Sequence, residues 1–369
     1  MKVPFLSVLV LLFFYSCEVG GIKNRYLDEY GSKVELQVLD SISFPLDSLT
    51  SPIFTASDYD EHEKIYSFLT DRKILFYDYE NRVLLKKLLL PLKQPTSYTM
   101  INKDSILVVD YNDSKIVLLD GEGRISSQWY IPQDIKYFPF PVNKLAPLVL
   151  KDDKIFFWGS ISGEYVDEND QNRRVMGILD VNTKKIMYEV PYPSCYKERN
   201  MGGGLFRWVY ADYNYRDEMF VISFPADNNI YVKDINGYDM FEYYGGSRYV
   251  DEIKYFNQSK FLPISSADKT KHFVENHSYG NILYDSYRDV YYRMVELKTQ
   301  YEGRFGWRKE FSVIILNSSF EIIGETFIGK CNLNCRYSMF VTERGLHIPQ
   351  EGNEEQLKFK IYGLCENSI

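Results

Sequence analysis

The chain has 369 residues, of which 45% are hydrophobic and 25% charged, the balance of a folded globular protein rather than a disordered one. Its net charge of −8 argues against a nucleic-acid partner, because such a partner requires a basic surface that displaces counterions. Four scattered histidines disfavour a histidine-rich metal site, and the 32 Tyr and 24 Phe favour β structure.

The first residues have the features of a signal peptide. Lys2 supplies a positive charge, and an almost wholly apolar run follows over residues 4–15. This run is shorter than the roughly 20 residues that a permanent membrane helix needs, but it suits the core of an export signal. We therefore predict a signal peptide over residues 1–16. No later segment offers 18 consecutive apolar residues, so we expect no second membrane span.

A small residue followed by cysteine ends the apolar run. Ser16-Cys17 resembles the lipobox of bacterial lipoproteins, in which the cysteine is acylated and becomes the new N-terminus. The usual lipobox has Leu and then a small residue where this chain has Phe14 and Tyr15, so an ordinary secretory signal with an incidental cysteine is the alternative. We predict lipid attachment at Cys17 and a tether over residues 17–32.

From about residue 50 the chain repeats one theme of strand, loop, strand, tight turn and strand. The first copy has Ile65–Leu69 and Lys73–Asp78, then a polar turn, and then Val83–Leu90. The turns often carry Asp or Asn with Gly, as hairpins with positive φ require. An apolar stretch before most copies, 53–54 in the first, adds a fourth strand. The other expected strands are 98–101, 105–110, 115–120, 124–131, 146–150, 154–158, 175–180, 185–190, 208–210, 219–223, 230–234, 240–244, 281–284, 290–295, 311–316, 320–327, 339–341 and 357–362.

Repeats of about 40 to 50 residues with four strands each indicate a β-propeller, and six copies indicate six blades. The sixth copy lacks an outer strand, and either Lys33–Leu39 or Ser41–Leu46 is expected to supply it and so to close the ring. The sequence therefore predicts an all-β, six-bladed propeller with four-stranded antiparallel blades, forming a single domain over residues 33–369. Inserted loops are expected around residues 159–173, 191–206, 250–279 and 298–310.

Particular segments carry a resemblance to a known group of proteins. They are Ser16-Cys17, the run Tyr243–Tyr249 at the end of a blade, and the run Tyr284–Arg293 that opens the fifth. Over nearly its whole length the chain resembles the uncharacterised six-bladed, TolB-like β-propeller lipoproteins of Bacteroidetes-type bacteria, a domain of unknown function. The resemblance implies the propeller fold and an exported, lipid-anchored protein of the cell envelope. It implies no catalytic residues.

Several short motifs fall short of a catalytic or metal site. His272 and His277 are five residues apart, whereas zinc-protease ligands on one helical face are four apart, so a polar inserted loop is preferred. Gly202–Gly204 lacks the Lys-Ser/Thr of a phosphate-binding loop and is interpreted as an inter-blade loop. Glu164–Asp170 lacks the EF-hand spacing for calcium, which favours a solvated loop. We predict no catalytic residue, no metal and no cofactor.

Four cysteines remain after residue 17, namely Cys195, Cys331, Cys335 and Cys365. Disulfides are allowed in an exported protein. The spacing of Cys331 and Cys335 favours a local disulfide or free buried thiols over zinc, because a zinc site needs further ligands and only His347 is near in sequence.

The start of the fifth copy combines basic, acidic and tyrosine side chains. Arg288, Asp289 and Arg293 lie there, and strand alternation places Tyr291 with Arg293 on one face. An arginine in this position forms either an inter-blade salt bridge, which we prefer, or a bidentate anion site. Trp208, Trp307 and loop tyrosines form either a carbohydrate-stacking platform or, as we prefer, ordinary blade packing.

Two functions fit these features. The first is a lipid-anchored envelope protein, at the outer membrane on its periplasmic or surface side, whose propeller is a binding or scaffold module for a glycan, a peptide or another protein. The alternative is a hydrolase or lyase that processes extracellular polymer at a site in the propeller channel, where residues from different blades meet only in space. The fold alone does not decide between them.

Overall fold

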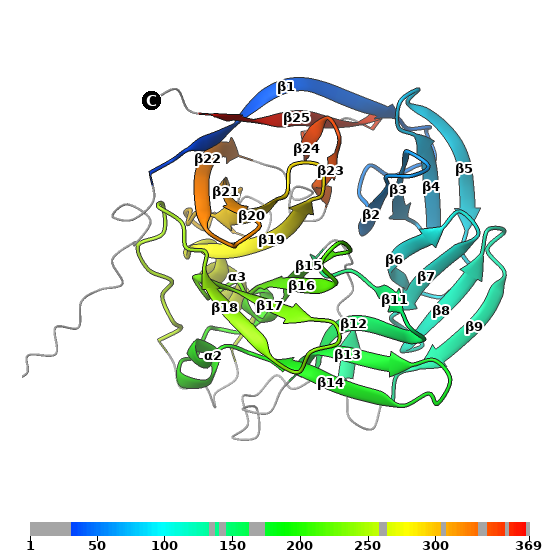
Figure 1. Ribbon diagram of the computed structural model, residues 1–369, viewed down its shortest axis with the longest axis horizontal. Helices are drawn as coiled ribbons and strands as arrows, with labels where there is room; N and C mark the ends of the chain where they lie inside the picture. Colours follow the sequence, from blue (N-terminus) through cyan, green and yellow to red (C-terminus); the bar gives the residue numbers. More distant parts are fainter. Residues whose placement is uncertain are drawn as a thin grey trace, which may run out of the picture.

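The computed structural model describes residues 31–132, 137–139, 145–161, 174–257, 264–303, 308–330, 338–350 and 354–366. These residues form six antiparallel sheets, which Figure 1 shows arranged as blades around a common centre. In the first five blades the strand nearest the centre comes first in the chain and the following strands lie progressively farther out, whereas the outermost strand of the sixth blade is the N-terminal β1 (Val34–Pro45). The predicted six-bladed β-propeller is confirmed. No helix in the described part of the chain is long and apolar enough to cross a membrane.

The strands of each blade follow one another from the centre of the ring to its rim. The first blade contains β2 (Ala56–Asp60), β3 (Ile65–Thr70), β4 (Lys73–Asp78) and β5 (Val83–Leu89), and the second contains β6 (Pro95–Asn102), β7 (Ser105–Asp110), β8 (Lys115–Asp120) and β9 (Ile125–Tyr130). The third contains β11 (Val149–Lys151), β12 (Lys154–Ile161), β13 (Arg174–Asp180) and β14 (Ile186–Pro191), with β10 (Tyr137–Pro139) paired to the far end of β12. The fourth contains β15 (Tyr210–Asn214), β16 (Met219–Ser223), β17 (Asn229–Asp234) and β18 (Met240–Tyr244). The fifth contains β19 (Ser278–Asp285), β20 (Val290–Glu296), β21 (Glu310–Asn317) and β22 (Ile322–Lys330). The sixth contains β23 (Phe340–Thr342), β24 (Gly345–Pro349), β25 (Gln356–Glu366) and β1 (Val34–Pro45).

The ring is closed by β1, as the sequence predicts. The two segments considered for this role are one strand, which pairs with β25 from Val34 opposite Glu366 to Pro45 opposite Gln356 and changes register between Val38 and Asp40. Figure 1 shows the two strands side by side at the rim of the ring. Two expectations are wrong in detail. Residues 53–54 precede the inner strand of the first blade instead of belonging to it, and β24 was not predicted.

An aspartate recurs where the third strand of a blade ends, and the structure gives its reason. Asp78, Asp120, Asp180 and Asp234 each accept hydrogen bonds from backbone N–H groups of the turn that follows. Asn317 has the same role in the fifth blade. Asp and Asn suit this position because their short side chains can satisfy turn N–H groups two or three residues ahead. The repeated residue therefore fixes the hairpins rather than marking a chemical site.

The antiparallel order of the strands gives the ring two different faces. Connections from first to second strand and from third to fourth strand leave on one side, which we call the hairpin face. Connections from second to third strand and between blades leave on the other side, the insertion face. All four insertions expected from the sequence connect strand ends that lie on the insertion face. The described parts of its long connections are 131–132, 145–148, 192–209, 245–257, 264–277, 297–303, 308–309 and 338–339.

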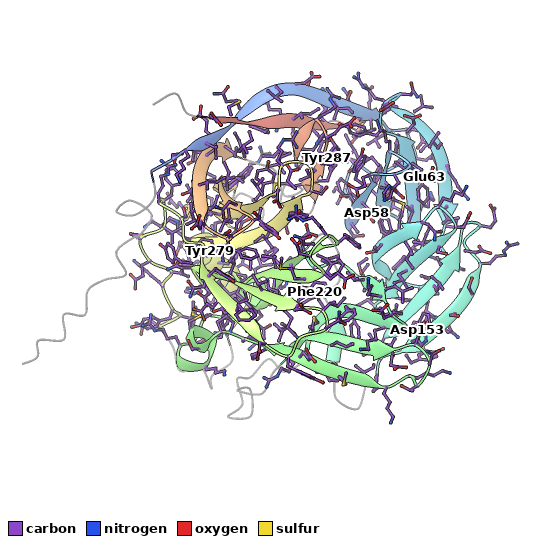
Figure 2. All side chains as sticks on the ribbon, in the orientation of Figure 1. Asp58, Glu63, Asp153, Phe220, Tyr279 and Tyr287 are labelled. Carbon is purple, nitrogen blue, oxygen red and sulfur yellow. The ribbon has the colours of Figure 1, made fainter. Side chains whose placement is uncertain are left out.

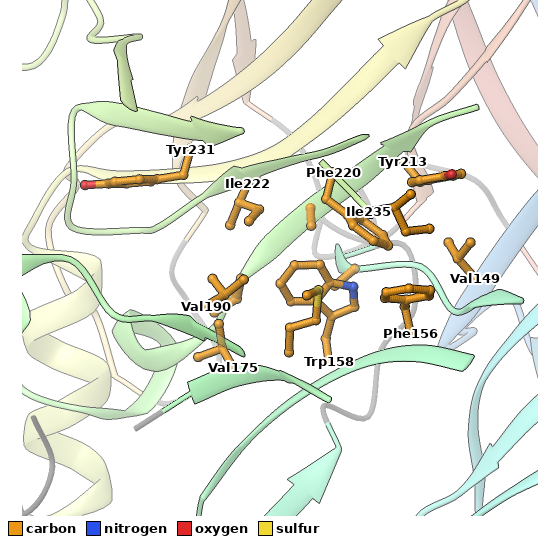
Figure 3. Packing of buried hydrophobic residues seen from close by; sticks show 14 of the residues in the cluster. Val149, Phe156, Trp158, Val175, Val190, Tyr213, Phe220, Ile222, Tyr231 and Ile235 are labelled. Carbon is orange, nitrogen blue, oxygen red and sulfur yellow. The ribbon is translucent and has the colours of Figure 1, made fainter. Parts of the chain in front are cut away.

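Neighbouring blades are held together by apolar side chains that alternate along the strands. Between the third and fourth blades, Phe156 and Trp158 of β12 pack on Phe220 of β16, with ring centres 5.7 and 5.4 Å apart (Figure 3). Each of these rings is almost fully buried. Burying one such side chain contributes roughly 1.5–3 kcal/mol to folding. The same arrangement recurs between the other blades, so most Tyr and Phe side chains of this aromatic-rich chain serve packing.

Candidate functional site

The connection between the third and fourth blades and the connection between the fourth and fifth blades fold into a compact unit on the insertion face. We call its described parts, residues 192–209, 245–257 and 264–277, the insertion platform. It contains α2 (Ser194–Glu198), the 3-10 turn η3 (Gly204–Arg207) and α3 (Ser266–Val274). These helical elements were not expected from the sequence, which suggested loops only. They give this face a fixed surface instead of a set of independent loops.

Helix α3 begins with a local sequence signal. Ser265 is the N-cap, and its hydroxyl accepts from the backbone N–H of Asp268 at 3.1 Å and donates to the Asp268 carboxylate at 2.6 Å. A Ser followed three residues later by an acidic residue is a variant of the capping box, which satisfies N–H groups that the first turn leaves free. This signal could have revealed the helix before the structure did.

The insertion platform has a small core of its own. Phe206 of η3 packs against Phe273 and His272 of α3, with ring centres 5.2 and 5.4 Å apart. Phe256 contacts the other side of the His272 ring at 5.1 Å. The buried members of this cluster are Met201 and Phe206 of the first insertion, Phe273 of the second, and Ala226 between β16 and β17, so the apolar contacts join segments distant in the sequence.

Glycine is required where the platform segments approach most closely. Gly202 has a φ of +80°, and a Cβ atom there would lie 2.6 Å from Cδ2 of His272. Both the backbone conformation and the available space therefore exclude larger residues. The glycine run 202–204 is an inter-blade connection, as predicted, and its positive φ angles turn the chain into η3.

Polar side chains join the segments of the platform to one another and fasten the platform to the propeller. The amide of Asn276 accepts from the N–H of Lys254 at 2.9 Å and donates to the carbonyl of Lys254 at 3.2 Å. The buried ammonium of Lys309, next to β21, donates to the carbonyls of Phe273 and Asn276 at 3.1 and 2.7 Å. Because these carbonyls end α3, the cation also meets the negative end of the helix.

The two histidines of the faint zinc-protease motif are part of this packing. His272 lies on α3, so the expectation of a loop is wrong for it, whereas His277 follows the helix and lies 3.4 Å from Asp251. Burial lowers the pKa of each imidazole to about 4, which keeps both neutral at pH 7. Within the described ranges, no three His, Cys, Asp or Glu residues are grouped so that they could hold a metal ion.

The inter-blade salt bridge preferred from the sequence is formed by Asp289, whereas the expectation is wrong for Arg288, whose ion pair is with Asp285 of its own blade at 3.0 Å. Asp289 forms an ion pair with Arg216 of the fourth blade at 2.5 Å. Arg288 donates to the carbonyls of Thr342 at 3.3 Å and Glu343 at 2.6 Å in the sixth blade.

Arg293 is completely buried and has a different set of partners. Its guanidinium donates to the Ser223 hydroxyl and to backbone carbonyls of Asp227, Asn228 and Gly245. Tyr291 shares the Arg293 face of β20, as expected from alternation, and both side chains pack toward the fourth blade.

The remaining sequence-predicted residues fall into two groups. Cys195 and Cys365 are free thiols and partly buried, and Trp208 is half-buried on the platform. Burial, with a smaller effect of Asp227, raises the pKa of the Cys195 thiol to about 12. Others lie outside the described residues, namely Cys17, Cys331, Cys335, Trp307 and the acidic run 164–170.

The outward surface of the platform presents an aromatic side chain beside a basic one. The residue Tyr255 is 51% exposed, and the guanidinium of Arg199 lies 5.6 Å from the centre of its ring. An exposed tyrosine supplies a large contact area at a low cost in conformational entropy, and arginine can form several hydrogen bonds, so both suit recognition. This pair, held on a rigid base, is the candidate contact point of the insertion face.

Comparisons with known proteins agree with this architecture. The family model described as a domain of unknown function, DUF4221, matches residues 38–327. A crystal structure of a DUF4221 member from Bacteroides vulgatus ATCC 8482 is 23% identical, with a TM-score of 0.73, over 91% of this chain and 99% of that one. A second structure, described as a "Putative exported protein" from Bacteroides fragilis NCTC 9343, is 10% identical, with a TM-score of 0.55, over 91% of this chain and 96% of that one. No curated protein matches the chain.

Proposed function

Because this chain belongs to the DUF4221 family of unknown function, its role must be argued from its own surfaces, and we propose that it is a lipid-anchored binding module of the cell envelope. The single observation that carries this proposal is the asymmetry of the ring. The long connections join strand ends on one face, and the described parts of the connections that precede the fourth and fifth blades form a platform with its own core. Rigid scaffolds that carry extra loops on one side commonly use those loops to bind partners.

The proposed anchor also gives the ring an orientation. The N–H of Lys33 donates to the carbonyl of Ile323 near the start of β22, so the chain enters β1 on the hairpin face. The sixteen residues 17–32 can span at most about 55 Å. Acylation of Cys17 would therefore attach the ring to the lipid from its hairpin face, and the insertion platform would lie on the opposite side of the ring. The partner is a glycan, a peptide or another envelope protein that reaches this outward face.

Site-specific photocrosslinking tests the proposed binding face. A photoreactive amino acid replaces Tyr255 on the platform, or Tyr238 on the hairpin face as the matched control, in the full chain expressed in its envelope. Tyr238 suits this comparison because it is 94% exposed. We expect discrete crosslinked products from position 255 that are missing from position 238. Identical products from both positions would reject the platform as the binding face, and so would an absence of products together with a blank glycan array.

A separate experiment tests lipid attachment at Cys17. Intact-mass analysis of membrane fractions should find the wild-type chain without residues 1–16 and with added acyl mass. The Cys17→Ala variant should lack the acyl mass and leave the membrane fraction. A wild-type chain without acyl mass would contradict the anchor while leaving the crosslinking result unaffected.

A further inference from the structure

One sector of the molecule exposes aliphatic side chains. Among the described residues, every Val, Leu and Ile that is more than half exposed lies between positions 38 and 89. The other described apolar residues with more than half of their surface exposed are aromatic, apart from Met187. A folded protein rarely exposes many aliphatic side chains in one region unless that region makes a contact. We call these seven residues the aliphatic patch: Val38, Leu39, Leu49, Ile53, Val83, Leu85 and Leu89, with exposed fractions between 53% and 80%.

The patch spans two neighbouring blades. Two of its residues belong to β1, three belong to β5, and two belong to the connection 46–55 that follows β1. Figure 1 shows β1 and β5 meeting at the rim, and Figure 2 shows side chains projecting outward along both strands. Ile42 of β1 and Leu84 of β5 pack in the same apolar core, and the Tyr77 hydroxyl donates to the carbonyl of Pro45 at 2.8 Å, where β1 ends. The two strands therefore hold fixed positions relative to each other.

The connection 46–55 brings Leu49 beside β5. The Asp47 carboxylate accepts from the N–H of Leu49 at 3.1 Å, and its other oxygen accepts from the ammonium of Lys87 in β5. Leu85 and Leu89 precede and follow Lys87 by two residues, so their Cα atoms lie about 7 Å from that of Lys87. Three exposed leucines from two blades thus lie around one ion pair.

The charges within the patch are nearly balanced. Over β1, the connection 46–55 and β5, the acidic residues are Glu35, Asp40 and Asp47 and the basic ones are Lys86 and Lys87, which gives a formal charge of −1. Lys86 lies 3.6 Å from Glu122 of the second blade, and Asp40 pairs with Arg344 of the sixth. Since the charges are paired, the aliphatic side chains determine what this surface can contact, and an apolar partner fits better than a charged one.

The composition of the patch favours lipid over protein as that partner. The energetic centres of protein interfaces are rich in Tyr, Trp and Arg, whereas Leu and Val are under-represented there. All seven patch residues are Val, Leu or Ile. Aliphatic side chains between lysines, whose stems can lie along apolar surface while the ammonium stays in water, suit the boundary between lipid headgroups and acyl chains.

The length of chain that precedes β1 brings the patch within reach of a membrane. Residues 17–32 can span at most about 55 Å, whereas β1 is about 40 Å long, so lipid attached at Cys17 can lie beside any part of β1. Such a tether gives the membrane surface a high effective concentration at the patch. A contact that would be weak for a free protein is then well populated.

We propose that the aliphatic patch lies against the lipid surface to which the chain is attached, so that the ring stands on the rim formed by β1 and β5. This inference rests on the lipid attachment of the proposed function and adds an orientation to it. The first blade is opposite the fourth in a ring of six, and Figure 1 shows α2 and α3 across the ring from β5. The insertion platform would then be the part of the ring farthest from the lipid.

Fluorescence quenching in vesicles tests the proposed contact. The acylated full chain, purified in detergent, is reconstituted into phosphatidylcholine vesicles whose acyl chains carry bromine as a quencher. An environment-sensitive fluorescent amino acid replaces Leu89 in the patch or Met187 in β14, which is 55% exposed on the third blade and is the matched control. We expect quenching at position 89 to be at least about threefold stronger than at position 187, and to persist in high salt because the contact is apolar.

Variants at other exposed positions check that the patch makes the contact. Leu49→Ser with Leu85→Ser should lower the quenching at position 89 about twofold or more, because less apolar surface is then buried. Phe241→Ser, at an exposed position on the outer strand of the fourth blade, should leave it unchanged. Unfolding curves check that every variant folds.

Four outcomes would overturn the proposal. They are equal quenching at positions 89 and 187, loss of quenching in high salt, an equal effect of Phe241→Ser, and shielding of position 89 without lipid by a second copy of the chain. In each of these the protein still sediments with the vesicles, so the anchor stands. A chain that does not sediment with the vesicles would contradict the anchor and this contact together, whereas photocrosslinking at Tyr255 tests the platform independently of both.

Discussion

The guanidinium of Arg293 lies over the ring of Tyr279, 3.9 Å from its centre, inside the interface of the fourth and fifth blades. Both side chains are completely buried, and burial is the main cause that lowers the pKa of Arg293 to about 10. The cation is nevertheless satisfied, because three backbone carbonyls and the Ser223 hydroxyl accept its hydrogen bonds. The interface is thus held by a charge that pairs with backbone carbonyls.

Replacement of Arg293 by Met should lower the free energy of unfolding by about 3 kcal/mol or more. In the variant the buried carbonyls of Asp227, Asn228 and Gly245 no longer accept a hydrogen bond from this side chain. Each buried carbonyl left without a donor lowers the free energy of unfolding. Denaturant unfolding of the two proteins measures the difference. Arg216→Met is the control, because the ion pairs of that exposed arginine and its contact with the Tyr284 ring lie at the surface, so its loss should lower stability little. Equal losses of stability in the two variants would mean that the buried hydrogen bonds of Arg293 stabilise the fold no more than the surface contacts of Arg216 do.

Replacement of Gly202 by Ala should loosen the insertion platform. A Cβ atom at this position would meet the ring of His272 and would also occupy a backbone conformation that L-residues disfavour. Hydrogen exchange followed by mass spectrometry should show faster exchange in α3, while the blade strands stay protected. Gly303→Ala provides the comparison, because Gly303 has a φ of +98° but nothing within 4 Å of the added atom. If both variants leave α3 equally protected, the contact with His272 is not what holds the helix.

The blades could be predicted from sequence because their signal is local and repeated. Lys73–Asp78 and Lys115–Asp120 each combine four consecutive apolar residues with an aspartate that starts a turn, so a short window of sequence is enough to predict the strand and its end. The strand β24 was missed since Gly345–Pro349 is short and its His347 is buried only through tertiary contacts. Helix α3 was missed because most of its residues are polar.

The contact between Glu61 and Ser286 could not have been found in the same way. Glu61 and Ser286 lie in blades far apart in the chain, and only closure of the ring brings them to 3.4 Å. Their hairpins do share a sequence pattern of Asp or Asn followed by four turn residues, which an alignment of the repeats would reveal. That pattern gives the position of Tyr215 in its turn but not the residues that it meets.

Acid should destabilise the protein partly through His347. Its Nε2 lies 2.7 Å from the Tyr79 hydroxyl and its Nδ1 3.0 Å from the Gly345 carbonyl, and burial is the main cause that lowers its pKa from 6.5 to about 3. The unfolded chain therefore takes up a proton below pH 6.5 while the folded chain does not. Stability is lost as the pH falls from about 6.5 toward 3, by up to about 5 kcal/mol in total.

Unfolding free energies measured across this pH range check the assignment. His347→Gln should cost stability at pH 7 but should make the decline with falling pH shallower, by about 1.4 kcal/mol per pH unit, the value for one proton. His272 and His277 should add similar slopes of their own down to about pH 4, so some acid sensitivity remains in the variant. Parallel curves for the two proteins would mean that His347 does not titrate as proposed.

Closure by β1 predicts that the chain can be circularly permuted. Val34 and Glu366 are directly paired on neighbouring strands, so an Asn-Gly turn can join them as an ordinary hairpin. New ends placed in the turn 181–185, between β13 and β14, interrupt no strand. This permutant should fold to the same ring, with a wild-type circular dichroism spectrum and one cooperative unfolding transition. A second permutant with the same joint but new ends between Val38 and Asp40 divides β1, and it should be strongly destabilised because neither half can pair along the whole of β25. If the second permutant were as stable as the first, continuous pairing of β1 with β25 would not be what closes the ring.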